Sequence, residues 1–129
     1  MVKKGEIRFF RLEISAFTSS DWDYSEISFD LEPYFGNPDL YISHNSLPED
    51  PNNLDSYSWK SVEEDGMESL TISKNSIGKQ TLIGETFYIA VVGQTAASFR
   101  ILAYSSNLSQ RELIFNCIEN GYAASSDLI

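Results

Sequence analysis

Apolar and polar residues alternate along most of this chain. A period of two is typical of β-strands that bury one face, because successive side chains of a strand point to opposite sides. We therefore predict strands with one buried face at Ile27/Phe29/Leu31, Tyr57/Trp59, Leu70/Ile72, Phe87/Ile89/Val91, Phe99/Ile101/Ala103 and Leu113/Phe115/Cys117.

The first segment of the chain changes its apolar phase. Ile7 and Phe9 share one phase, whereas Phe10, Leu12 and Ile14 share the other. A one-residue change of face within a strand is what a β-bulge produces. We predict a bulge near Phe9.

Turn-forming residues separate the predicted strands, and no segment shows a helical stripe with caps. The polar stretch 45–56 carries two prolines, which oppose strand pairing, so we expect an exposed loop there. Short strands with regular turns indicate an all-β fold, an antiparallel β-sandwich of seven to eight strands. We expect it to be jelly-roll-like or immunoglobulin-like.

The charge balance narrows the classes of partner. The 129 residues fit one domain, and nine Lys and Arg against nineteen Asp and Glu give a net charge of −10. Such a charge disfavours nucleic acid and direct membrane binding. A solvated acidic surface is the favoured interpretation, with Ca²⁺ or a basic protein as the alternative partner.

The single cysteine and the amino terminus say little about compartment. Cys117 has no second cysteine with which to form a disulfide or a thiolate zinc site. The opening residues 1–6 resemble neither a signal peptide nor a membrane span. We expect the chain to be an excised part of a longer secreted or surface protein.

No catalytic constellation emerges, so we predict that the chain is not an enzyme. Every acidic residue is expected in a polar turn or on a solvent face, where a carboxyl group would not gain a raised pKa for acid–base catalysis. His44 is the only histidine, and we expect it to end a strand beside a loop, exposed and far from Cys117.

Aromatic residues flank the polar loop and are candidates for ligand binding. Tyr41, Tyr57 and Trp59 could stack on a sugar or peptide face, with Tyr34 and Phe35 nearby. The alternative, favoured for Trp59, is that the indole packs in the core between the sheets. No cofactor is expected.

Several short motifs occur in a familiar order. They are Gly5-Glu6-Ile7-Arg8-Phe9-Phe10, Gly36-Asn37-Pro38-Asp39-Leu40-Tyr41, Tyr57-Ser58-Trp59, Gly84-Glu85-Thr86-Phe87-Tyr88-Ile89-Ala90-Val91 and Ser98-Phe99-Arg100-Ile101. In this order they resemble the bacterial pre-peptidase C-terminal domain, which is related to the collagen-binding domains of collagenases. Pro38 and Trp59 are similar to a variant found as repeats in surface proteins of unicellular eukaryotes.

The resemblance spans about Gly5 to Tyr104 and divides the chain into 1–105, a sandwich of this family, and 106–129, a C-terminal strand or linker that could lead to a next repeat. It implies a non-catalytic module of secreted or cell-surface proteins, which acts in protein assembly or adhesion through a protein or glycan partner or through neighbouring domains. A carbohydrate- or matrix-binding module and a calcium-responsive C2-like domain are the alternatives.

The resemblance also bears on calcium. Some family members bind Ca²⁺ near the turn before the Leu-Tyr strand. Here Asp39 matches the pattern, whereas Asn37 replaces the usual first Asp. Asp21 and Asp23 are the other metal candidates, and we expect weak or absent Ca²⁺ binding.

Overall fold

The computed structural model describes residues 2–14, 25–64, 67–104, 116–119 and 122–125. These residues form nine strands: β1 (Ile7–Glu13), β2 (Glu26–Phe35), β3 (Pro38–His44), β4 (Trp59–Ser61), β5 (Glu68–Ser73), β6 (Thr86–Gly93), β7 (Ser98–Tyr104), β8 (Asn116–Glu119) and β9 (Tyr122–Ser125). Two single-turn 3-10 helices, η1 (Leu54–Ser56) and η2 (Lys74–Ile77), lie in the connections. No alternation predicted β3 or β9.

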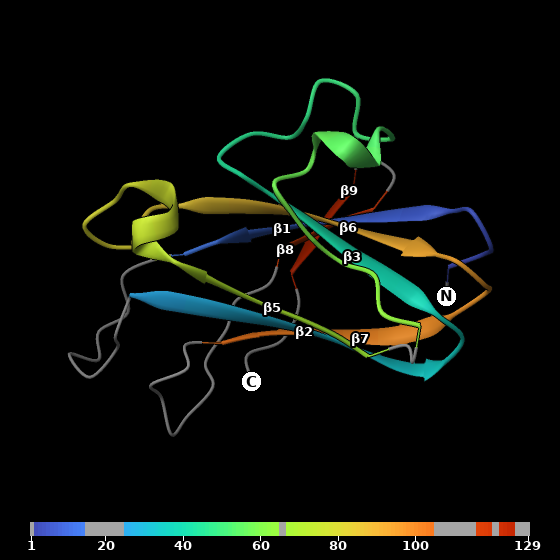
Figure 1. The fold of residues 1–129 in the computed structure, drawn as a ribbon. Helices are drawn as coiled ribbons and strands as arrows, with labels where there is room; N and C mark the ends of the chain where they lie inside the picture. The colour runs from blue at the N-terminus through green and yellow to red at the C-terminus, as the bar shows by residue number, and fades with distance from the viewer. Residues whose placement is uncertain (1, 15–24, 65–66, 105–115, 120–121, 126–129) are drawn as a thin grey trace.

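The strands form two antiparallel sheets that pack face to face (Figure 1). One sheet has the order β4-β3-β6-β1-β8-β9 and the other the order β5-β2-β7. The predicted all-β antiparallel sandwich is therefore confirmed. Within the described part of the chain, no helix is long and apolar enough to span a membrane.

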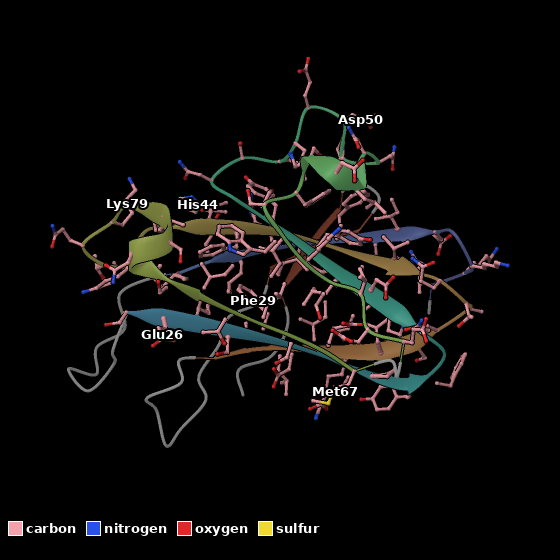
Figure 2. All side chains as sticks on the ribbon, viewed as in Figure 1. Glu26, Phe29, His44, Asp50, Met67 and Lys79 are labelled. Carbon is pink, nitrogen blue, oxygen red and sulfur yellow. The ribbon has the colours of Figure 1, made fainter. Side chains whose placement is uncertain are left out.

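The core lies between the inner faces of the two sheets. The alternating residues of β2 and β6 that the sequence predicted to be buried all belong to it: Ile27, Phe29, Leu31, Phe87, Ile89 and Val91. The rings of Phe29 and Phe87 meet edge to face, with centroids 5.8 Å apart. Figure 2 shows Phe29 between the layers. This contact joins the central strand of the smaller sheet to the larger sheet.

Both faces of β1 carry apolar side chains. Its register with β6 continues without a break over all seven residues of the strand, so the predicted bulge near Phe9 is wrong. Phe10 and Leu12 face the main core, whereas Ile7 and Phe9 pack against a second apolar cluster. The phase changes because apolar groups lie against both sides of the strand.

The second cluster lies on the outer face of the larger sheet. The segment 45–58, which includes η1, passes over this face (Figure 1). Most of 45–56 is exposed, as predicted, and Leu54 packs beneath it. The buried members of the cluster are Tyr41, Tyr57, Ala90 and Val92.

The turn between β2 and β3 approaches the β6–β7 turn closely. Gly36 has a φ of +82°, and a Cβ there would lie 2.2 Å from the carbonyl oxygen of Ala96, so glycine is required. The Asn37 amide donates to Thr95 Oγ1 at 2.9 Å, and the Gln94 amide donates to the Asn37 carbonyl at 3.0 Å. These bonds fix the position at which β3 begins.

The strand predicted at the carboxyl end is described in part. Leu113 and Phe115 lie outside the described residues, whereas Cys117 lies in β8 opposite Phe10 of β1. β9 then pairs with β8, so this hairpin extends the larger sheet.

Candidate functional site

Large apolar side chains are exposed where β2 ends. They are Tyr34, Phe35 and Met67, with 70%, 52% and 51% of their surface exposed. The register between β2 and β7 shifts between Pro33 and Phe35, which marks a bulge. A bulge re-aims side chains at a sheet edge. Here two consecutive aromatic residues are both left in solvent.

Met67 immediately precedes β5, the strand that pairs with β2. Leu31 of β2 is opposite Glu68 of β5, and both are buried, so the adjacent positions Glu32 and Met67 face outward. Tyr34 is two positions beyond Glu32 on the same strand, within reach of a long side chain. Figure 2 shows Met67 on the outer side of the smaller sheet.

A charged pair borders these apolar groups. Arg100 of β7 lies opposite Glu32, and its Nη2 donates to the Glu32 carboxylate. This hydrogen bond is the main cause that raises the pKa of Arg100. We call Tyr34, Phe35, Met67 and Arg100 the β2 patch. Aromatic residues, Met and Arg are the types enriched at protein interfaces.

The two tyrosines predicted to bind a ligand lie together, but they pack against each other inside the second cluster. Tyr41 and Tyr57 are both buried, with edge-to-face rings whose centroids lie 6.0 Å apart. The Tyr57 hydroxyl donates to the Pro51 carbonyl at 2.9 Å. Burial is the main cause that raises the pKa of Tyr57 to about 12. The two ring faces therefore pack inside the second cluster.

Trp59 lies apart from these tyrosines, on the opposite face of the sheet. It pairs with Ile42 in the β3–β4 register and, half-buried, packs against the main core. The predicted core packing of Trp59 is thus confirmed for part of its surface. The remainder is exposed because β4 is the edge strand of its sheet.

Of the three predicted metal ligands, Asp39 alone falls within the described residues; Asp21 and Asp23 lie outside them. Asp39 is 3% exposed, and the side chains of Gln94 and Glu68 act on the pKa of its carboxyl group. In the part of the chain that the structure describes, no group of three or more His, Cys, Asp or Glu residues could hold a metal ion.

Glu68, at the start of β5, is a functional candidate that the sequence analysis missed. It is 0% exposed, and its Oε2 accepts hydrogen bonds from Ser61 Oγ and from the Glu63 amide, the latter at 3.0 Å. The expectation that every acid lies in a turn or on a solvent face is therefore wrong for Asp30, Asp39 and Glu68. The signal was present, because Glu68 continues the apolar phase of Leu70/Ile72.

The environment of the two carboxyl groups favours their neutral forms. Burial is the largest cause that raises the pKa of both Asp39 and Glu68. Hydrogen bonds from Ser61 and the Glu63 amide oppose the shift at Glu68, whereas the charges of Asp39 and Glu63 add to it. Glu68 and Asp39 therefore form a coupled acid pair.

His44 also differs from its prediction. The distance between His44 Nε2 and Glu85 Oε1 is 2.8 Å, and 16% of the His44 side chain is exposed. It packs near Phe87, with ring centroids 5.3 Å apart. β3 ends at His44 beside the loop, as predicted, but the expected exposure is wrong because His44 pairs with Phe87 of β6 and its ring packs there.

Comparisons of the chain with protein-family models, with curated proteins and with solved structures find no match. The resemblance to the pre-peptidase C-terminal domain stays an expectation from sequence.

Proposed function

We propose that this chain is a non-catalytic interaction module of a secreted or cell-surface protein, and that it acts in protein–protein assembly or adhesion through the β2 patch. The observation that carries the proposal is the exposure of two consecutive aromatic residues, Tyr34 and Phe35, beside Met67. Exposed apolar groups that gather at one place with a charged border are typical of interaction sites.

The composition of the β2 patch supports a protein partner. Tyr34 and Met67 supply apolar contact area, and Arg100 supplies directional donors. The ion pair between Arg100 and Glu32 holds the guanidinium in place before a partner arrives. A preorganised side chain loses less entropy on binding.

The net charge of the chain constrains the partner further. A charge of −10 attracts positively charged surfaces and repels acidic ones. The partner best suited to the β2 patch is a protein with an apolar pocket surrounded by Lys and Arg. Its association rate would fall as the salt concentration rises.

Site-specific photocrosslinking tests the proposal. A photoreactive residue replaces Met67 in one variant and Lys79 in the control, since Lys79 is exposed beside η2, away from the patch (Figure 2). Each purified variant is incubated with surface and secreted fractions of the source cells. We expect one crosslinked protein that depends on position 67.

A second substitution separates specific from incidental crosslinking. Tyr34→Ser in the position-67 variant should abolish the crosslinked species if the patch binds as a unit, whereas Trp59→Phe, which keeps the core packing, should leave it in place. Equal crosslinking from positions 67 and 79 would overturn the assignment of the β2 patch. Loss of the species with Trp59→Phe alone would favour the carbohydrate- or matrix-binding alternative.

A further inference from the structure

The Asp39–Glu68 pair lies where the two sheets meet at one edge. Asp39 belongs to β3 of the larger sheet, and Glu68 belongs to β5 of the smaller one. The chain passes from β4, which is paired with β3, into β5. A proton shared by the two carboxyl groups would therefore connect the two sheets, which no sheet hydrogen bonds join.

One oxygen of each carboxyl group has no hydrogen-bond partner. These two atoms, Asp39 Oδ1 and Glu68 Oε1, are both buried. The two side chains are nevertheless close enough to hydrogen-bond to each other. Two ionised carboxylates would repel, and neither could donate. A single proton on the pair supplies the missing donor and satisfies both oxygens at once.

Among the described residues, the charges that act on Glu68 are all negative. They come from Asp39 and Glu63. Tyr41 of β3 and Asp55 of η1 are the further titratable groups nearby: burial first, and then the charges of Asp39, Asp55 and Glu68, raise the pKa of Tyr41. Ser61 and Gln94 contribute neutral hydrogen bonds.

We propose that Asp39 and Glu68 share one proton and form a pH-sensitive latch between the two sheets. When the shared proton is lost, two negative charges remain in a buried site, and the start of β5 separates from β3. The Glu63 amide and Ser61, which bind Glu68 Oε2, then lose their fixed acceptor. The opening is local, because the apolar core around Phe29 does not depend on it.

The direction of the pH dependence follows from the raised pKa values. Both pKa values in the folded protein lie above their ordinary values, 3.8 for Asp39 and 4.5 for Glu68. The folded state therefore binds protons more tightly than the unfolded state. The stability from the pair is fully present below these ordinary values and is lost as the pH rises through the folded pKa values.

Amide hydrogen exchange provides the local test. The protection factor of the Glu63 amide is measured between about pH 5 and pH 8 in the parent protein, in Glu68→Gln and in a control, Glu49→Gln, which removes a charge from the exposed loop. Gln at position 68 mimics the protonated acid, since it donates permanently to Asp39. We expect protection at Glu63 to fall at least about tenfold with rising pH in the parent and the control. In Glu68→Gln it should stay constant within about threefold.

Two further measurements keep the proposal open to refutation. Asp39→Asn should flatten the pH dependence in the same way, and it serves if Glu68→Gln does not fold. Urea unfolding with EDTA and with CaCl2 distinguishes a proton from a metal ion. A Ca²⁺-dependent rise of the midpoint in the parent, lost in Glu68→Gln, would show that a cation bridges the carboxylates and would overturn the proton-sharing latch. An identical pH slope in the parent and both variants would overturn it as well.

Discussion

Met67 and Glu68 are neighbours in the chain, yet each lies in the environment that would ordinarily suit the other. The apolar Met67 is half exposed at the surface, and the acidic Glu68 is completely buried. Their orientation follows from one fact, the pairing of Glu68 with the core residue Leu31. A strand allows no other arrangement, because successive side chains point to opposite faces. The register between β2 and β5 thus determines both the exposure of Met67 in the β2 patch and the burial of Glu68 in the acid pair.

The two environments are expected to have separate roles. Burial of an acid costs free energy unless the group is protonated or paired, so Glu68 should control stability and its pH dependence. Exposure of an apolar side chain costs little in the free protein, so Met67 should control binding alone. Local departures from the usual pattern often mark functional positions.

The largest effect is expected for Glu68→Ala. The substitution removes the acceptor of Ser61 Oγ and the Glu63 amide and leaves a cavity between the sheets. At about pH 5 the free energy of unfolding should fall by about 2–4 kcal/mol, measured by urea unfolding. At about pH 8 the loss should be smaller, since removal of the charge also relieves repulsion with Asp39. A loss that grows with pH would contradict the proton-sharing pair.

An intermediate effect is expected for Trp59→Ala. A fully buried Trp typically contributes about 3–5 kcal/mol, and Trp59 is half-buried at the edge of the core. We therefore expect the free energy of unfolding to fall by about 2 kcal/mol in urea. Trp59→Phe, as a control, should retain most of the free energy of unfolding that Trp59→Ala loses. A change below about 0.5 kcal/mol would show that the indole is not a packing residue.

Much of the fold follows from the sequence alone. The alternation in β2 and β6 predicted which residues belong to the main core. The expectation of a single buried face is wrong for these strands, because Ser28, Asp30, Ala90 and Val92 are buried as well. In β1, a bulge and a strand with both faces covered give the same local pattern, so the phase change at Phe9 does not distinguish them. The second face is covered by residues from 41, 54 and 57, which are distant in sequence.

The candidate sites were predictable in part. Tyr34 and Phe35 were noted as aromatics, but only the β2–β7 register reveals that both are exposed beside Arg100. Glu68 lies in phase with apolar residues, and that alternation alone predicts an inward side chain. Its pairing with Asp39 depends on how two sheets meet, and this contact between residues twenty-nine positions apart has no local signature.

A smaller effect is expected for Tyr57→Phe, which tests the packed outer face. The lost hydrogen bond from Tyr57 to the Pro51 carbonyl should reduce the free energy of unfolding by about 1 kcal/mol at neutral pH. The pKa of Tyr57 is raised from 10.0 to about 12, so this stabilisation persists below pH 10 and is lost as the pH rises through 12. Absorbance titration of the phenolates should lose its last step in Tyr57→Phe but not in Tyr34→Phe.

The smallest effect on stability is expected for Met67→Ser. This substitution tests the exposed member of the Met67–Glu68 comparison. Met67 is half exposed and lies outside the main core cluster. Its loss should change the free energy of unfolding by less than about 0.5 kcal/mol, because surface substitutions away from packed groups usually have little effect. If the β2 patch binds a protein, the same substitution should weaken that binding about tenfold or more, since interface Met and Tyr side chains bury a large apolar area. Surface plasmon resonance with the crosslinked partner measures the affinity, and Lys79→Ser is the matched control. A stability loss above about 1 kcal/mol would show that Met67 packs in the folded domain, and the separation between the outward and inward residues of this strand would not hold.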